Sequence, residues 1–434
     1  MDARKEACLQ MIVQSSMPAH LWQGSRRPFA ELVALALFLA GITSVHGQWD
    51  WLERVDESLH VQFPNGSFRT DLSGLLDLEG YYIDQLPPGL IYGNDDAFIN
   101  PRLSLFLDTR LGEHLYSFVQ ARVDRGFDPR EQVRDARADE YLLRYLPFAD
   151  ARLSIQAGKF ATVFGNWVPR HDSWQNPFVT EPLPYGNFTP ITDQSAPDSR
   201  QAFLARRNRP LQKDVWVPII WGPSYASGAA IFGTLAKLDY AFEVKNAALS
   251  SRVDFWDGAD QGWEHPTFTG RIGTRINPAW NIGASLSYGS YLAPPADPTL
   301  DPGTGRGDFR QITIGQDVSF VWHHWQVVAE AIEARFEVPR VGNADTISYY
   351  LEAKCKLTPR LFAALRWNQQ LYGTVPDEQG LPAQWGQDIW RIESALGYRF
   401  SRHLQAKLQY GYSGMNSPRQ EGEQLLAAQL TLKF

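Results

Sequence analysis

Runs of roughly ten to fifteen residues in which apolar and polar side chains alternate dominate the chain after residue 47. In the run 345–357, Leu351 and Cys355 belong to an apolar odd-numbered set, whereas Glu352 and Lys354 belong to a charged even-numbered set. Because successive side chains of a strand point to opposite faces, each run predicts a strand with one apolar and one wet face. About ten residues cross a bilayer as a tilted strand, so these lengths fit membrane-spanning strands.

We count sixteen such runs and no long segment with helical periodicity after residue 47. The runs cover residues 69–83, 98–111, 114–126, 137–148, 151–163, 224–235, 237–249, 266–276, 280–292, 309–322, 324–337, 345–357, 360–372, 388–400, 402–414 and 423–434. An even number of strands paired in chain order closes into an up-and-down barrel. The predicted fold class is therefore all-β: a transmembrane, antiparallel up-and-down β-barrel of about 16 strands.

The connections between the runs alternate between tight and long. They are tight at residues 112–114, 148–150, 277–279 and 401–402, and long between these points. Barrels of the bacterial outer membrane have short periplasmic turns and longer outer loops. The pattern predicts that the tight turns and both ends of the barrel lie on the periplasmic side.

Aromatic residues gather near both ends of the predicted strands. Trp280, Trp322, Trp325 and Phe400 lie beside tight turns, and Tyr82, Tyr288, Tyr372 and Tyr412 lie toward the long loops. Two aromatic girdles are expected of a barrel in a bilayer. They favour the membrane barrel over a large secreted soluble β protein, which stays open as an alternative.

The chain divides into three predicted parts. Residues 31–47 form a short apolar stretch behind Arg26 and Arg27, which predicts that residues 1–47 are a secretory signal peptide. Residues 48–68 are predicted to be a short periplasmic segment, and residues 69–434 form the barrel. The longest connection, 164–223, is inserted in the barrel as an enlarged third loop.

The wet face of the predicted strands carries many charges of both signs. A lumen with such a wall must hold water, because unpaired charges in a dry core cost several kcal/mol each or more. The predicted pore-lining residues are Arg102, Arg110, Arg122, Asp124, Arg144, Arg152, Arg271, Arg275, Glu352, Lys354, Arg366, Arg391, Glu393 and Arg399. Bases slightly outnumber acids on this wall, which favours a weak anion preference although the net charge of the chain is −7.

The third loop is rich in proline and aromatic residues, which predicts an ordered segment with a function. We expect residues 165–213 to fold inward against the basic wall of the second to fifth strands and to narrow the lumen. The residues predicted to constrict the pore are Arg170, Asp172, Glu181, Asp193, Asp198, Arg206, Arg207 and Arg209.

The sixteen runs, the enlarged third loop and the terminal Phe434 together resemble the 16-stranded bacterial outer-membrane porins. The resemblance implies that the third loop folds into the barrel and that the terminal strand serves as a signal for the barrel-assembly machinery. It also makes a homotrimer an open option. The sequence Gly158-Lys159-Phe160 is weakly similar to the phosphate-selective porin O and P group, whose lysine-rich eyelet has no counterpart here beyond three arginines of the third loop.

The sequence thus predicts a porin in the bacterial outer membrane, a passive channel for ions and small hydrophilic or anionic solutes. Its expected partners are outer-membrane lipid and these solutes, without nucleic acid, since the chain has no basic footprint. No catalytic group, metal or cofactor is expected. A barrel enzyme of lipase or protease type remains as an alternative, although His171-Asp172-Ser173 lacks the surroundings of a catalytic triad.

Overall fold

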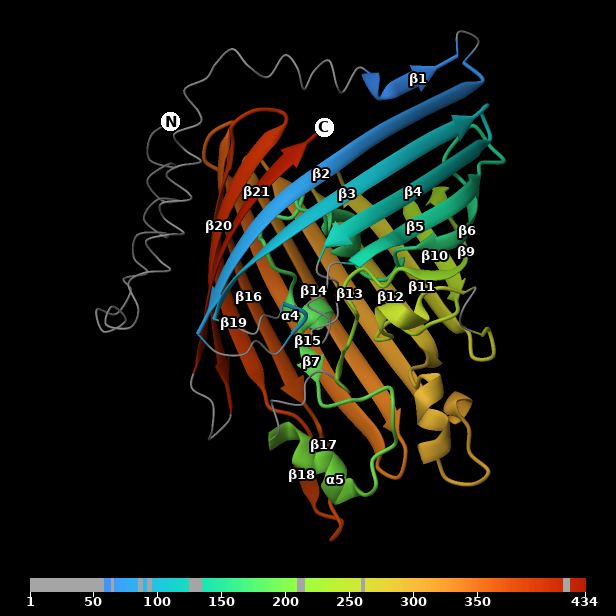
Figure 1. Cartoon of the computed structure of the whole chain (residues 1–434), viewed down its shortest axis with the longest axis vertical. Coiled ribbons are helices and arrows are strands. Elements are labelled where there is room, and N and C mark those ends of the chain that lie inside the picture. The colour runs from blue at the N-terminus through green and yellow to red at the C-terminus, as the bar shows by residue number, and fades with distance from the viewer. Residues whose placement is uncertain are drawn as a thin grey trace, which may run out of the picture.

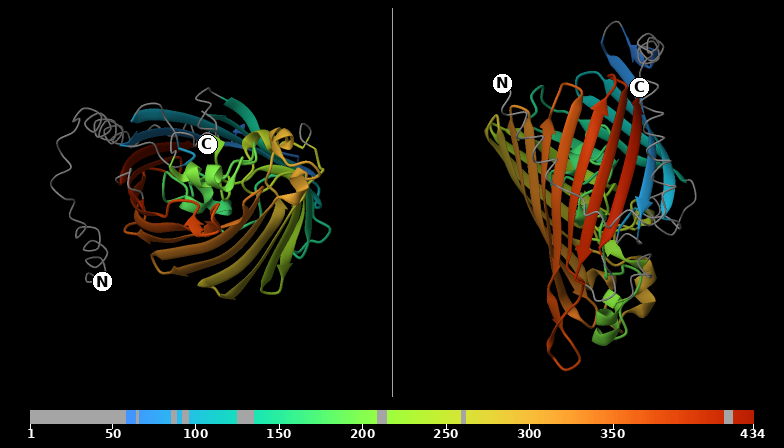
Figure 2. Two further views of the ribbon diagram at one scale, coloured as in Figure 1. Left: turned by 90° about the horizontal axis from the view of Figure 1, so that it is seen from below. Right: turned by 90° about the vertical axis from the view of Figure 1, so that its left-hand side faces the viewer.

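Sixteen antiparallel strands form a closed barrel in the computed structural model, which describes residues 58–63, 66–84, 89–91, 96–124, 135–208, 215–258, 262–416 and 422–434 (Figures 1 and 2). The strands are β2 (Phe68–Ile83), β3 (Ala97–Leu111), β4 (Leu115–Asp124), β5 (Asp135–Tyr145), β6 (Ser154–Phe160), β9 (Ala226–Leu235), β10 (Leu238–Lys245), β11 (Thr267–Asn277), β12 (Trp280–Ser290), β13 (Arg310–Trp322), β14 (Trp325–Val338), β15 (Gly342–Lys356), β16 (Leu361–Tyr372), β19 (Ile389–Arg399), β20 (Leu404–Met415) and β21 (Glu423–Lys433). Each predicted run overlaps one of them. The predicted fold class is confirmed.

The remaining elements are short and lie in the connections. They are β1 (His60–Gln62), η3 (Val168–Arg170), α4 (Leu183–Gly186), β7 (Phe188–Thr189), α5 (Arg200–Ala205), η4 (Arg206–Asn208), β8 (Val217–Pro218), η6 (Val253–Phe255), η7 (Pro294–Thr299), η8 (Arg306–Asp308), β17 (Thr374–Pro376) and β18 (Pro382–Gln384). Among the described residues, none of the helices has the length and apolar character to cross a bilayer.

The predicted signal peptide lies outside the described residues, and the segment 48–68 is described only in part. Within it, β1 pairs antiparallel with the start of β2, with His60 opposite Asp71.

The barrel closes by pairing β2 with β21. The amide of Gly74 donates to the carbonyl of Phe434 at 2.8 Å, and the amide of Phe434 donates to the carbonyl of Gly74 at 3.1 Å. A side chain at position 74 would overlap the Phe434 ring, so only glycine leaves room for that ring at this position. These bonds hold the last residue to the first strand of the barrel.

Short turns lie at the end of the barrel where the chain terminates, and most long loops lie at the opposite end (Figure 1). One turn at the long-loop end is short as well. Here β14 and β15 extend beyond the predicted runs and leave a connection of three residues, 339–341, with Arg340 at a φ of 63°. Hydrogen bonds of the hairpin continue to the end of both strands, with Val338 opposite Gly342.

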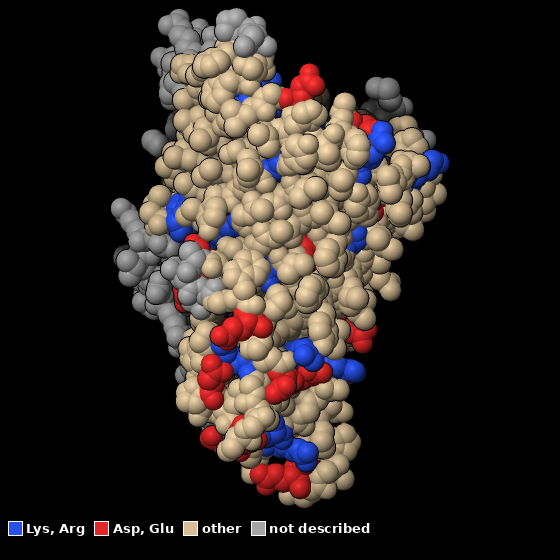
Figure 3. Space-filling view, turned by 90° about the vertical axis from the view of Figure 1, so that its right-hand side faces the viewer, with Lys and Arg blue, Asp and Glu red and all other residues tan. Residues whose placement is uncertain are grey.

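The outer face of the barrel is a belt of large apolar side chains. Leu351 is 52% exposed and Leu396 is 44% exposed, as expected of side chains that face lipid. Figure 3 shows that the middle of one side is largely free of charge, whereas charged residues gather at the long-loop end. For one residue, Tyr372, the prediction of a place in the outer aromatic girdle is wrong. It pairs with Thr346 on the inner face and is buried against Trp385.

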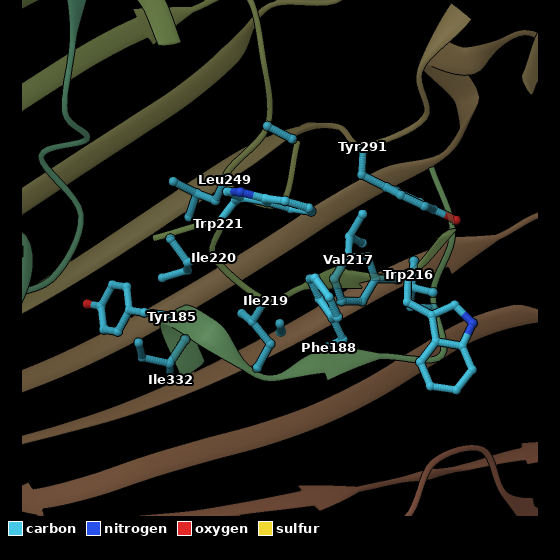
Figure 4. Close-up of a cluster of buried hydrophobic side chains, with 14 of the residues drawn as sticks. Tyr185, Phe188, Trp216, Val217, Ile219, Ile220, Trp221, Leu249, Tyr291 and Ile332 are labelled. Atoms are coloured by element: carbon cyan, nitrogen blue, oxygen red, sulfur yellow. The ribbon is translucent and has the colours of Figure 1, made fainter. Parts of the chain in front are cut away.

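A hydrophobic core fills part of the interior of the barrel (Figure 4). Ile332 and Phe336 of β14 point inward and pack with side chains of the third loop, among them Ile219 and Trp221, which are fully buried. The prediction of a wet inner face therefore fails on this part of the wall. The alternation along β14 places these side chains inside correctly, but the interior they enter is dry.

Candidate functional site: a passage beside the third loop

The third loop runs from residue 161 to residue 225, between β6 and β9. Much of its described part lies inside the ring of strands, whereas α5 lies at the long-loop end (Figures 1 and 2). Lys407 of β20 fastens one part of it, because its Nζ donates to the carbonyls of Ser173, Asn176 and Phe178 at 2.8, 3.0 and 3.0 Å. Three backbone carbonyls satisfy all three donors of the ammonium group. This lysine therefore fixes the turn that follows η3.

Arginine and glutamate side chains fasten the rest of the loop to the same side of the barrel. Arg366 of β16 donates to the carbonyl of Thr180 at 2.9 Å and to Glu393 at 2.6 Å. Arg170 of the loop forms an ion pair with Glu352 of β15 at 2.5 Å. These charges are buried, so removing one partner of such a pair would leave an unpaired buried charge and would lower the free energy of unfolding.

Thr162, Gly165 and Ile219 of the loop also bond Glu243 of β10, Ser285 of β12 and Gln311 of β13. The loop thus lies mainly against β10 to β20, and our prediction that it lies against the second to fifth strands is wrong. The reason is that the arginines of that wall already have acidic partners on neighbouring strands. Arg102 bonds Asp77 and Glu79, and Arg122 lies 2.9 Å from Asp139. The loop instead meets a wall whose carboxylates accept from its backbone and side chains.

A cavity of about 410 Å³ remains between the loop and the opposite wall. On the barrel side it is lined by β2, β3, β4, β5 and β21, and on the loop side mainly by residues 167–181. The cavity therefore lies to one side of the lumen.

All but one of the predicted pore-lining residues lie on inward-facing strand positions. The exception is Arg152, which lies in the turn before β6, is 54% exposed and pairs with Asp150. Arg102, Arg122 and Asp124 line the cavity. Under the loop the interior is dry: Arg366 is fully buried and Glu393 is 1% exposed, which the sequence did not predict.

The other predicted positions are distributed around the wall. Arg271 forms an ion pair with Asp317 at 2.7 Å, and Arg144 donates to Gln156 at 2.9 Å. Arg391 bonds Ser413. The remaining residues lie toward the short-turn end, and these are Arg110, Arg275, Lys354 and Arg399.

Only part of the predicted constriction lies at the centre of the barrel. Arg170 faces Glu352, while Asp172 and Glu181 line the cavity. Asp193 forms a buried ion pair with Arg252 at 3.0 Å. The remaining residues lie nearer the long-loop end or outside the described part: Asp198 is exposed, Arg206 packs over Phe203, Arg207 bonds the carbonyl of Gln384, and Arg209 is not among the described residues.

Aromatic side chains on the cavity wall were missed by the sequence analysis. Phe98 and Phe106 share the inner face of β3 with Arg102, and Phe118 lies on the inner face of β4. The rings of Phe106 and Phe118 stack with centroids 6.3 Å apart. The signal was present, because these rings occupy the same even-numbered positions as the inward charges of their strands.

His171 is a neutral residue at the inner edge of the loop. Its Nδ1 donates to the carbonyl of Val168 at 2.6 Å, and its Nε2 accepts from the hydroxyl of Tyr225 at 2.6 Å. Burial, followed by the nearby Arg122 guanidinium, lowers the pKa of His171 to about 4. Burial raises the pKa of the Glu181 carboxyl, which lines the cavity.

Comparison with solved structures gives the same architecture. The chain resembles the anion-selective porin from Comamonas acidovorans at a TM-score of 0.54 and 9% identity, over 85% of this chain and all of that one. It resembles Salmonella typhi OmpF at a TM-score of 0.54 and 12% identity over 86% and 100%, and the outer membrane channel DcaP of Acinetobacter baumannii at 0.52 and 10% over 86% and 99%. Searches of family models and of curated protein sequences gave no match.

The closed hydrogen-bonded wall and the apolar outer belt suit a bilayer, where every backbone polar group must be satisfied within the protein. A barrel of this kind belongs in the bacterial outer membrane. The site within it combines a polar passage with a loop that is fixed to one wall.

Proposed function

Because the chain has the fold of the 16-stranded outer-membrane porins, we propose that it is a passive diffusion channel for small hydrophilic solutes and not an enzyme. The observation that carries the proposal is the cavity beside the third loop, which has charged and polar residues on both of its sides. Sixteen strands enclose an aqueous channel, whereas eight leave room only for side chains. In this proposal the loop narrows that channel, and the cavity is the space left for solutes.

We further propose a weak preference for anions. Lys354, Arg399 and Lys433 point inward near the short-turn end, and none of them forms an ion pair with a described residue. Their partners are neutral: Lys354 lies over the Phe362 ring, and Arg399 bonds Gln405. Positive charges without acidic partners raise the local concentration of anions in a narrow pore.

Single-channel recording in a planar bilayer tests both parts of this proposal. Folded protein should give ohmic steps, and a salt gradient should give a reversal potential on the anion side. The double variant Lys354→Gln/Arg399→Gln should shift that potential toward cations. The control Arg335→Gln removes a charge from the outer rim, where the arginine pairs with Asp345, and should leave it unchanged.

Two outcomes would contradict the proposal. A correctly folded barrel that never conducts would exclude the channel, and assays for lipase and protease activity would then test the alternative. Conductance with no preference for anions would exclude the proposed selectivity and leave the proposed channel standing.

We infer a homotrimer from the uneven height of the wall. β6 has 7 residues and β10 has 8, whereas β14 and β15 have 14 and 15. A strand needs about 9 to 11 residues to cross the bilayer, so the low wall is best covered by another copy. Native mass spectrometry in detergent should give the mass of three chains, and a purely monomeric spectrum would exclude the trimer.

The terminal strand is proposed as the segment that the barrel-assembly machinery recognises. It pairs with β2 and ends in an outward-facing aromatic ring. Deleting Phe434 should lower the yield of folded barrel in the outer membrane, measured by its heat-modifiable migration on a gel, whereas Phe434→Tyr should restore it.

A further inference from the structure

We infer that the passage binds neutral saccharides, solutes with an apolar ring face and many hydroxyl groups. This inference rests on the proposed channel and names its class of solute.

Aromatic rings give the passage flat apolar surfaces on both sides. Phe98, Phe106 and Phe118 of the barrel wall are partly exposed, as is Trp174 of the loop, and all four line the cavity. The inner face of a water-filled barrel is ordinarily polar. Aromatic rings in such a wall gain free energy when a solute covers them with an apolar face, as the C–H side of a sugar ring does.

Polar groups between the rings offer both donors and acceptors. Arg102 is held by Asp77 and Glu79 and is still 20% exposed, so its orientation is fixed before a solute arrives. Across the cavity lie two carboxylates of the loop, Asp172 and Glu181. A hydroxyl group both donates and accepts, so it can bond either kind of wall group.

The mixture of signs argues against a solute with a net charge. Inside the cavity, an anion beside Arg102 would also meet carboxylates such as Asp172 and Glu181, and a cation would meet Arg102. The bases behind the proposed weak anion preference of the ion current, Lys354, Arg399 and Lys433, lie at the short-turn end of the barrel. A neutral polyhydroxylated solute avoids both conflicts. The cavity volume of about 410 Å³ lies within the range of small-ligand sites, about 300 to 1,000 Å³.

Block of the ion current by sugar measures the binding directly. Maltose and maltotriose, added to a conducting channel, should reduce the current in a saturable manner. Polyethylene glycol of equal hydrodynamic size, which lacks hydroxyl-bearing rings, should reduce it only in proportion to its concentration. Gluconate and glucosamine should bind more weakly than glucose because each carries a charge.

Aromatic variants connect the binding to the proposed wall. Phe106→Leu and Trp174→Leu keep an apolar side chain and remove the ring, and each should weaken maltotriose binding about ten-fold. The control Phe242→Leu changes an aromatic residue of the outer face, 45% exposed, and should bind maltotriose like the wild type.

The outcomes separate the two proposals. A channel that conducts but is blocked by sugar no better than by polyethylene glycol overturns the saccharide inference and leaves the channel intact. A folded protein without conductance overturns the channel. In that case, tryptophan fluorescence in detergent tests maltotriose binding, and no saturable change would overturn the inference as well.

Discussion

Gly158 shows how a single residue determines the local path of the wall. Its φ is +137°, a conformation that side chains rarely adopt, and a Cβ there would overlap the carbonyl oxygen of Tyr141 on β5. The glycine of the Gly158-Lys159-Phe160 sequence therefore has a structural role at the end of β6. Its backbone leads the chain from the barrel wall into the third loop.

Replacing this glycine should destabilise the barrel. Gly158→Ala is expected to cost about 1–3 kcal/mol, because strain of the backbone adds to the overlap with Tyr141. Urea unfolding in detergent measures the loss. Gly305→Ala is a matched control, since a Cβ at position 305 meets open space and its φ is −129°. Equal stability of both variants would show that β6 can relax at this point.

His171 makes the stability of the loop dependent on pH. The pKa of His171 is about 4 in the folded protein, whereas its ordinary value is 6.5. Between pH 4 and pH 6.5 the imidazole is therefore protonated in the unfolded chain and neutral in the folded chain. The free energy of unfolding is therefore unaffected by this group above pH 6.5, and it decreases by roughly 2–3 kcal/mol as the pH falls toward 4. Urea midpoints from pH 4 to 7.5 measure it. His171→Gln should flatten this part of the profile, and an unchanged slope would assign it to other groups.

Side-chain direction was predictable for the wall, but burial was not. The alternation places Arg366 and Glu393 inside, as the structure has them. It cannot show that loop carbonyls cover them, because such contacts join distant parts of the chain. Arg366 and Thr180, for example, are 186 positions apart. Such long-range contacts depend on the whole fold.

All sixteen strands were predictable because the alternation of apolar and polar side chains extends over the full height of the wall. The inward fold of the third loop was also foreseen, whereas the wall that it meets was not. The sequence did not show which wall the loop meets, because Arg102 and Arg122 have acidic partners on adjacent strands. Such cross-strand pairs depend on the register of the strands.

Two adjacent residues of β3 test the two faces of the wall at one depth. Leu105 points outward and Ser104 lines the cavity. Leu105→Arg should cost about 2–4 kcal/mol near the midplane, and Ser104→Arg should cost much less because the guanidinium can reach water. Refolding into lipid vesicles compares them. Ser348, which the alternation also places inside, is fully buried and does not line the cavity, so it would be a poor control. Similar losses at both sites would refute the assigned faces.

For the whole molecule, the interior core is as important as the hydrogen-bonded wall. Trp221 is fully buried among side chains of the loop and of the barrel. This core could not be predicted from the sequence, because the apolar residues of a long connection can cover the barrel, join another copy or enter the lumen. Only the closed fold decides between these arrangements.

Truncating this tryptophan should therefore weaken the entire barrel. Trp221→Ala is expected to lower the free energy of unfolding by about 3–5 kcal/mol, the usual cost of removing a buried aromatic side chain. The control Trp263→Ala removes a tryptophan that is 48% exposed and should change little. Thermal melting of the folded form on a gel compares the variants, and equal melting temperatures would mean that the core does not contribute to global stability.

Because the cavity lies to one side, the barrel has two parts whose sequences can vary independently: the strands that bind the loop and the strands that line the cavity. Residues on β14 to β20 hold the loop by buried charges, so most substitutions there are costly. The wall of β2 to β4 borders the cavity on the opposite side. A designer of nanopores could therefore randomise Phe98, Phe106 and Phe118 to obtain new permeation properties, and natural variation could follow the same route, while the supporting half of the molecule stays as it is.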